Sequence, residues 1–251
     1  MTTKIFPDYQ TLSRATADLI KDYILHKKTS LICLASGHTP VGVFQNLIED
    51  VKEGSLDISK CTFLSLDEWV GIDPHDSGSC LSMLKRDFFD PLKIPDTQIE
   101  FFNVLSDDLE KECDRINALI KHKGGLDIMF VGVGTNGHIG MNEPGTSFNS
   151  YAHVGDLAEE TKTVGQKYFS QQTSLSKGMT LGLKHLQDAK LPIVMANGEK
   201  KAAIMAKAFD QQPTEQIPVT IVQLIKQGFV MVDEDAGREI SSKTQDVRSE
   251  I

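Results

Sequence analysis

The sequence has 251 residues, of which 40% are apolar and 24% charged, and its formal net charge is −9. This composition is typical of a globular protein long enough to bury a large core, and it excludes the overall basic character of a nucleic-acid-binding protein. The chain does not open with a basic stretch followed by an apolar one, and no run of about 18 apolar residues occurs, so we expect neither a signal peptide nor a membrane span.

The cysteine content points to the same class of protein. No C-x-x-C pair occurs, and a free cysteine behaves as a small buried hydrophobe, so we expect all of them to be reduced and structural. Together with the absence of a signal peptide, this predicts a cytoplasmic protein. The four residues are Cys33, Cys61, Cys80 and Cys113.

Short apolar runs alternate with amphipathic stretches along the chain. The first helix is expected over roughly Tyr9–His26, and a later one begins near Leu109 with Ser106 or Asp107 as candidate caps. The apolar runs are nearly continuous, as in strands that are buried on both faces. These predicted strands are Leu31–Ala35, Thr62–Leu66, Ile128–Gly132, Pro192–Ala196 and Phe229–Val232.

Strands separated by helices require crossover connections, which produce a mainly parallel sheet. We therefore predict an α/β fold, a single-domain, Rossmann-like, three-layer arrangement over residues 1–251 whose first strand begins near residue 31. Residues from about 236 to 251 are polar and are expected to form a frayed tail. In such folds the active site lies beyond the carboxyl ends of the strands, which selects the segments after Ala35, around Asp67 and after Gly132.

The first of these segments reads Ser36-Gly37-His38-Thr39-Pro40. A glycine-containing turn leads into a helix that Thr39 can cap and whose first turn suits Pro40. Helix-start amides with serine and threonine hydroxyls bind a phosphate well, although an ordinary strand–turn–helix connection has the same pattern. The spacing is not that of a P-loop.

The second segment holds two adjacent acids, Asp67 and Glu68, directly after a predicted strand. Adjacent residues of an extended chain face opposite ways, so the two carboxylates should have different roles. One can face the cleft as a base while the other makes local contacts; a pair of helix-capping acids is the alternative interpretation.

The third segment, residues 132–145, is dense in glycine, which indicates close backbone approach or positive φ angles. It also contains Asn136, His138 and Glu143. A histidine that titrates near neutrality beside a carboxylate is a general acid–base unit, whereas an isolated histidine is usually structural. The spacing fits neither a dinucleotide fingerprint nor a metal-ligand cluster, so we expect no cofactor and no metal.

Four motifs together resemble the glucosamine-6-phosphate deaminase family: G-x-T-P, L-D-E-W, G-x-G-x-N-G-H-I-G-x-N-E-P-G and M-T-L-G-L. They lie within roughly Leu31 to Asp233, which is nearly the whole chain. The Asn-Gly-His and Asn-Glu-Pro-Gly block is the most specific of them. Trp69, in place of the commoner tyrosine, is closer to the galactosamine-6-phosphate isomerase branch of the family.

The resemblance implies roles for the catalytic candidates. Asp67 matches the base that moves a proton between C2 and C1 of the sugar. His138 matches the residue that opens the sugar ring, and Glu143 matches its carboxylate partner. Asn136 stands where many members carry aspartate and some carry asparagine, so the details of this relay stay open.

The resemblance also implies a phosphate site. Lys201 matches a phosphate-binding lysine, although the sequence around it would otherwise be interpreted as a solvated helix face. Lys167 falls, by a loose alignment, where members often carry a phosphate-binding arginine. The phosphate-binding turn corresponds to Ser36, Gly37, His38 and Thr39.

The implied reaction converts galactosamine 6-phosphate or glucosamine 6-phosphate to the ketohexose 6-phosphate and ammonia, in amino-sugar catabolism. The residues suit this chemistry, because an imidazole of near-neutral pKa can pass a proton to the ring oxygen and a positioned carboxylate can move the C2 proton. The only partner expected is the small-molecule sugar phosphate. The hexosamine epimer and the oligomeric state, a homo-oligomer included, stay open.

Two other functions fit less well. A 6-phosphogluconolactonase resembles this family in its fold and its Gly-His loop, but the Asn-Glu-Pro-Gly continuation and the L-D-E-W motif argue against it. A non-catalytic sugar-phosphate sensor of a bacterial repressor would carry a DNA-binding helix-turn-helix unit before the first strand. This chain is acidic and has one predicted helix before its first predicted strand.

The resemblance finally bears on regulation. Some hexameric relatives respond to an N-acetylated amino-sugar phosphate that binds between subunits at a basic pair after the Asn-Glu-Pro block. Counting on from Glu143 without gaps places His153 and Gly155 at those positions, with the hydroxyls of Thr146 and Ser147 nearby. None of these supplies a fixed positive charge at pH 7, so we expect an enzyme without this control.

Overall fold

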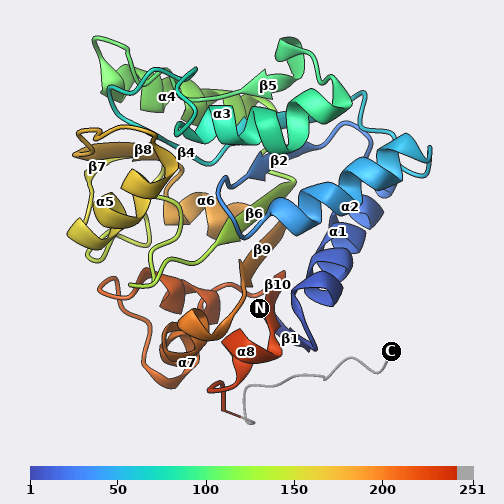
Figure 1. The fold of residues 1–251 in the computed structure, drawn as a ribbon, viewed down its shortest axis with the longest axis vertical. Coiled ribbons are helices and arrows are strands. Elements are labelled where there is room, and N and C mark those ends of the chain that lie inside the picture. The colour runs from blue at the N-terminus through green and yellow to red at the C-terminus, as the bar shows by residue number, and fades with distance from the viewer. Residues whose placement is uncertain (242–251) are drawn as a thin grey trace.

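The computed structural model describes residues 1–241, and its centre is a seven-stranded sheet in which all neighbouring strands are parallel (Figure 1). The strand order is β1-β10-β9-β6-β2-β3-β5. The strands are β1 (Thr2–Phe6), β2 (Leu31–Leu34), β3 (Thr62–Ser65), β5 (Ile99–Glu100), β6 (Ile128–Gly132), β9 (Leu191–Ala196) and β10 (Phe229–Asp233).

Helices cover both faces of this sheet, which confirms the predicted three-layer α/β fold (Figure 1). Residues of α1 and α2 share one core cluster with one face of the strands, while residues of α4, α6 and α7 share another with the opposite face. The helices are α1 (Tyr9–His26), α2 (Val41–Lys52), α3 (Cys80–Leu84), α4 (Leu109–His122), α5 (Glu159–Gly165), α6 (Leu183–Asp188), α7 (Ala202–Asp210) and α8 (Glu234–Gly237).

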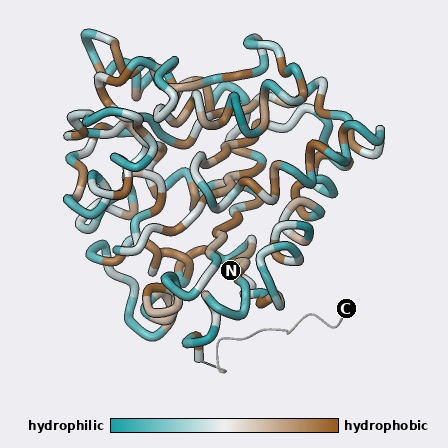
Figure 2. The backbone as a smooth tube through the Cα atoms, viewed as in Figure 1, coloured by the Kyte–Doolittle hydropathy of each residue, from teal (hydrophilic) through white to brown (hydrophobic). Residues whose placement is uncertain are grey.

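Strand β2 shows how an apolar run serves two cores. Ile32 and Leu34 belong to the cluster beneath α1 and α2, while Leu31 and Cys33 belong to the cluster beneath α4. Because successive side chains of a strand point to opposite faces, a strand buried on both sides must be continuously apolar. Figure 2 shows the same arrangement, with hydrophobic residues gathered along the central strands. All four cysteines are buried and free, as expected.

A second, smaller sheet was not expected from the sequence. It is antiparallel, and its order is β4-β8-β7. Each of its strands has only three or four residues, too few to establish an alternating pattern. The strands are β4 (Asp67–Trp69), β7 (His153–Asp156) and β8 (Lys177–Thr180).

The ends of the chain differ from expectation. Strand β1 precedes α1, so the prediction that the first strand lies near residue 31 is wrong. Strand β1 is an edge strand that pairs with β10, and its mixed polar and apolar sequence gave no strand pattern. Helix α8 and the buried side chains of Ala236 and Ile240 occupy the described part of the expected polar tail. Residues 242–251 lie outside the described residues. Within residues 1–241, no helix combines the length and apolar character that a membrane crossing requires.

The cap of α4 also differs from the prediction. Asp108, and not Ser106 or Asp107, is the N-cap, because its side chain accepts a hydrogen bond from the backbone nitrogen of Lys111 at 3.1 Å. An aspartate at this position satisfies one of the free amides of the first turn.

The strand order places a crevice at the carboxyl end of β2. From β2 the chain continues to β3 on one side, and β6 is added on the other side. The connections leaving β2 and β6 therefore diverge, and a parallel sheet opens a ligand-binding crevice at such a point. The segments that follow β2 and β6 are the two glycine-containing loops singled out in the sequence.

Candidate active site

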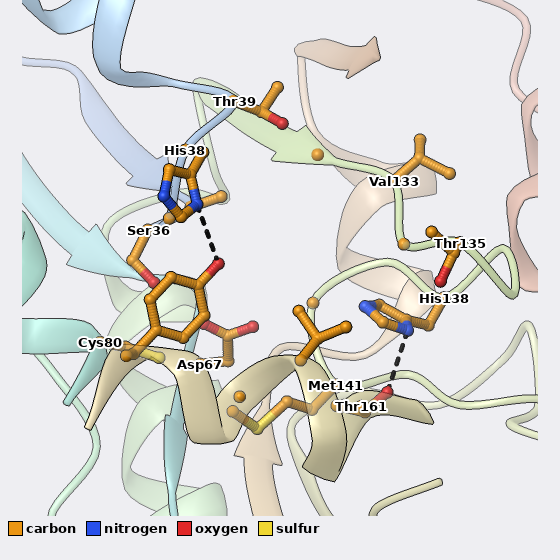
Figure 3. A pocket seen from close by; sticks show the side chains of 18 of the residues that line it. Ser36, His38, Thr39, Asp67, Cys80, Val133, Thr135, His138, Met141 and Thr161 are labelled. Carbon is orange, nitrogen blue, oxygen red and sulfur yellow. Dashed lines mark hydrogen bonds between the residues drawn. The ribbon is translucent and has the colours of Figure 1, made fainter. Parts of the chain in front are cut away.

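A pocket of about 750 Å³ lies at this crevice (Figure 3). Loops from the carboxyl ends of β2, β6 and β9 form one side, and Asp67 at the start of β4 contributes as well. Helix α5 and the following 3₁₀ turn η4 (Gln166–Tyr168) form the opposite wall. The three strand ends chosen from the sequence therefore meet in one cavity, together with a wall that the sequence did not predict.

The turn after β2 lines the pocket, but its helix is capped differently from the prediction. The N-cap of α2 is Pro40 and makes no side-chain cap, so Thr39 is not the capping residue. Instead, the Tyr9 hydroxyl of α1 donates to the Thr39 carbonyl at 3.0 Å and accepts from the Gly42 nitrogen at 2.8 Å. Gly37 has a φ of 94°, which favours glycine. The pocket-lining residues of this turn include Ser36, Gly37, His38 and Thr39.

Within the described part of the chain, three lysines line the pocket: Lys167, Lys200 and Lys201. Lys201, at the end of the 3₁₀ turn η5 (Glu199–Lys201), is half-buried, and burial lowers the pKa of its ammonium group. Within residues 1–241 no ion pair is made by Lys201, so its charge is available to an anion in the pocket. Lys167, on η4, also lines the pocket but is exposed.

The two adjacent acids face different ways, as the extended backbone predicts. Glu68 accepts hydrogen bonds from the backbone nitrogens of Cys80 and Leu81 at 2.9 Å, so it anchors the start of α3. Asp67 lines the pocket and is only 8% exposed. Burial, and secondly the charge of Glu68, raise the pKa of Asp67 to about 7.

The glycine-rich loop after β6 packs closely against β4 and β8. Gly140 has a φ of 60°, and a Cβ there would lie 2.7 Å from Thr180 Oγ1 and 3.2 Å from Asp67 Oδ2. The side-chain amide of Asn142 donates to the carbonyls of Ile139 and Leu181, at 2.7 and 2.9 Å. The M-T-L-G-L motif thus holds this loop in place beside Asp67.

His138 lines the pocket, while Asn136 and Glu143 lie behind it. Asn136 donates from Nδ2 to Glu143 Oε2 at 3.0 Å and accepts from the His138 backbone nitrogen at 3.0 Å. Glu143 Oε2 lies 3.7 Å from His138 Nδ1. Burial lowers the pKa of His138 and the charge of Glu143 opposes this, so the neutral imidazole dominates at pH 7.

The structure adds residues that the sequence interpretation missed. Thr161 Oγ1 of α5 lies 3.2 Å from His138 Nδ1. The Tyr168 ring stacks on His38 with centroids 5.6 Å apart, and Cys80 lines the pocket near Asp67 (Figure 3). No sequence signal identifies these side chains, because each reaches the site from a distant segment. Within residues 1–241, no group of three or more His, Cys, Asp or Glu side chains is placed to hold a metal ion.

The chain is similar to known proteins of one family. The family described as glucosamine-6-phosphate isomerases/6-phosphogluconolactonase matches residues 9–231. Glucosamine-6-phosphate deaminases from Geobacillus sp. (strain WCH70) and Bacillus pumilus are 33% and 34% identical to the chain, covering 91% and 92% of it and 92% and 97% of their own lengths. A solved monomeric glucosamine-6-phosphate deaminase has a TM-score of 0.91 at 31% identity and covers 95% of this chain and 100% of its own.

The lactonase side of the family is more distant. The 6-phosphogluconolactonase from Trypanosoma brucei has a TM-score of 0.74 at 17% identity, covering 96% of this chain and 98% of its own. At that identity the likeness concerns the fold alone. The chain is therefore an enzyme of the glucosamine-6-phosphate isomerase/6-phosphogluconolactonase family.

Proposed function

We propose that this chain is an amino-sugar-6-phosphate deaminase that converts glucosamine 6-phosphate to the ketohexose 6-phosphate and ammonia, in the breakdown of amino sugars. The observation that carries the proposal is that Asp67 and His138 line the same pocket as the glycine turn after β2 and Lys201. The relatives named as deaminases, which match this chain over nine-tenths of its length, support it.

His138 opens the sugar ring. Its imidazole takes the proton of the C1 hydroxyl and returns a proton to the ring oxygen, so that the C1–O5 bond breaks and an aldehyde forms at C1. A neutral imidazole can accept the first proton at pH 7. Glu143 stabilises the imidazolium that forms for a moment, because its carboxylate lies 3.7 Å from Nδ1.

Asp67 then moves hydrogen along the open chain. The carboxylate removes the C2 proton while O1 takes up a proton from solvent, which gives an enol-amine. The carboxylic acid then returns the first proton to C1, which leaves a protonated imine at C2. Water adds to this imine, and ammonia leaves as the ketone forms. A base with a pKa of about 7 is well matched to this exchange, since it is ionised enough to accept the proton and acidic enough to return it.

The phosphate lies at the turn after β2 in this proposal. The backbone of Gly37 and the hydroxyls of Ser36 and Thr39 provide donors, and Lys201 provides the positive charge. Lys167 and Lys200 are further cations that line the pocket. The arrangement resembles other helix-start phosphate sites, in which amides and a few cations share the dianion.

Ammonia release tests the proposal directly. We expect turnover of glucosamine 6-phosphate that is unchanged by exhaustive chelation, because the reaction needs only acid–base groups. Galactosamine 6-phosphate is the second candidate substrate and rests on Trp69, which lines the same pocket. Turnover of neither sugar, loss of activity on chelation, or hydrolysis of 6-phosphogluconolactone in place of deamination would each contradict the proposal.

A further inference from the structure

The ring of His138 packs closely against the glycine-rich loop after β6. A Cβ at Gly134 would lie 2.2 Å from His138 Cε1, so the ring lies directly against the Gly134 backbone. In this structure Nδ1 points to Thr161 on the α5 wall of the pocket, and the other ring nitrogen, Nε2, points toward the middle of the pocket (Figure 3). The group that binds Nδ1 therefore determines whether Nε2 faces the substrate with a proton or with a lone pair.

Two oxygen atoms lie near Nδ1, and only one is within hydrogen-bonding distance. Thr161 Oγ1 is 3.2 Å away, whereas Glu143 Oε2 is 3.7 Å away. Glu143 Oε2 already accepts a hydrogen bond from Asn136 Nδ2 at 3.0 Å, which holds it at that distance. Since a carboxylate can only accept, a proton on Nδ1 is favoured over a lone pair there.

Thr161 is well placed for a permanent contact. Its side chain belongs to α5, and the residue is only 5% exposed. Thr161 lies 23 residues after His138 in the chain. A threonine hydroxyl on a rigid helix keeps its position better than a long side chain does, because only one side-chain torsion sets the oxygen. The contact therefore fixes the ring plane as well as the position of the proton.

We propose that Thr161 is a positioning residue for His138: its hydroxyl oxygen accepts the Nδ1–H, which leaves the Nε2 lone pair facing the sugar for ring opening. This inference rests on the proposed deaminase function. The imidazole that accepts the C1 hydroxyl proton must carry its own proton on the far nitrogen. The later proton transfer at C2 belongs to Asp67 and does not require Thr161.

The test compares Thr161→Val, which keeps the shape but removes the hydroxyl, with Thr161→Ser, which keeps the hydroxyl. We expect Thr161→Val to lower kcat for ammonia release roughly 10- to 100-fold, part of the roughly 10²- to 10⁴-fold that a general acid–base group contributes. KM should change less than about two-fold, since no phosphate contact is lost, and Thr161→Ser should restore most of kcat. An open-chain substrate analogue should escape most of the defect of the valine variant.

A spectroscopic measurement on the unliganded protein separates positioning from packing. In ¹⁵N-histidine spectra, with the His138 signals assigned by their loss in His138→Asn, the wild-type ring should carry its proton on Nδ1 above its pKa. Thr161→Val should shift both nitrogen signals toward a mixture of tautomers, and Thr161→Ala gives the same reading if the valine variant does not fold.

The outcomes distinguish the two proposals. A wild-type ring protonated on Nε2, or a valine variant with unchanged spectra and kcat, would overturn the role of Thr161. Equal losses in the serine and valine variants with unchanged spectra would do the same, because packing would then be the cause. If no amino-sugar phosphate is turned over by the wild-type protein, the deaminase function fails while the spectra still report on the hydrogen bond.

Discussion

Asp67 places its carboxyl group where water is largely excluded, and burial, followed by the charge of Glu68, raises its pKa to about 7. Asp67→Asn should lose C2 proton transfer by roughly 10²- to 10⁴-fold while KM stays nearly unchanged, because the phosphate contacts lie elsewhere in the pocket. Exchange of the C2 proton with deuterated solvent measures this step. Exchange at the wild-type rate in Asp67→Asn would assign the base to another residue.

The same carboxyl group should cost stability at neutral pH. An unfolded aspartate has a pKa near 3.8, so between about pH 4 and 7 the folded state holds a proton that the unfolded state releases. The free energy of unfolding therefore falls as pH rises through this window, and the loss persists above pH 7. Asp67→Asn should raise the melting temperature by at least a few degrees at pH 8 and leave it unchanged at pH 4.

Asp127 provides a control, because its pKa is shifted in the direction opposite to that of Asp67. Against the effect of burial, ion pairs with Lys190 and Lys27 hold the pKa of Asp127 below its ordinary value, so its charge contributes stability above about pH 4. Asp127→Asn should lower the melting temperature at pH 8. A parallel change in both variants would show that the buried charge of Asp67 is not the cause.

A substitution of Lys201 tests the proposed phosphate site most directly. Lys201→Ala should raise KM for the phosphorylated sugar about 10-fold or more, because a charge-assisted contact to a dianion is lost, with a smaller effect on kcat. Lys207→Ala, at an exposed position of α7 outside the pocket, is the matched control and should leave KM unchanged. An unchanged KM in Lys201→Ala would show that Lys201 does not bind the phosphate.

At the scale of elements, the packing of α1 on α2 supports the turn after β2, which is the proposed phosphate site. The two helices approach so closely that a Cβ at Gly42 would lie 2.5 Å from Ser13 Oγ. At this contact the Tyr9 hydroxyl bridges the Thr39 carbonyl and the Gly42 nitrogen. Helix α1 therefore supports the turn through Tyr9, although none of its residues is among those that line the pocket.

Tyr9→Phe tests this support. Loss of a hydrogen bond costs about 1 kcal/mol, so we expect KM for the phosphorylated sugar to rise roughly five-fold while kcat changes little. Tyr23→Phe removes a hydroxyl from the same helix, whose partner Asp127 lies at the opposite end of β2, and should leave KM unchanged. Equal effects of both substitutions on KM would mean that α1 acts through general stability.

At the scale of the whole molecule, the two positions where an effector phosphate would bind hold neither lysine nor arginine. His153 and Gly155 lie on β7, an edge strand of the small sheet. Ser147, one of the nearby hydroxyls, donates to Glu215 Oε1 at 2.9 Å, so a carboxylate occupies that position. An anion there therefore meets the carboxylates of Asp156 and Glu215, and the neighbouring Lys177 ammonium lies 4.0 Å from the Asp156 carboxylate.

We expect hyperbolic kinetics without activation by N-acetylglucosamine 6-phosphate. An effector shifts a population only when it binds one conformation better than another, and the charge of Lys177 beside β7 already faces the Asp156 carboxylate. Substrate titrations with and without the compound provide the measurement. A sigmoidal curve that the compound converts to a hyperbola would show that another group supplies the charge.

The sequence by itself determined the central architecture and selected the residues to which the proposal assigns the chemistry. Continuous apolar runs with helices between them identify five of the parallel strands, since a strand buried on both faces leaves no other pattern. The rule that sites lie at strand ends then selects Asp67 and His138, which the structure brings to one pocket. Alternation along the chain likewise separated the roles of Asp67 and Glu68.

Only the tertiary structure decided what supports these groups. The edge strand β1 and the short sheet β4-β8-β7 lack a pattern of their own, because pairing and packing stabilise them more than local sequence does. Thr161 and Tyr9 reach their partners across 23 and 33 residues of chain, and nothing in the spacing of a single sequence encodes such contacts. The pKa of Asp67 is of the same kind, because burial is a property of the folded chain.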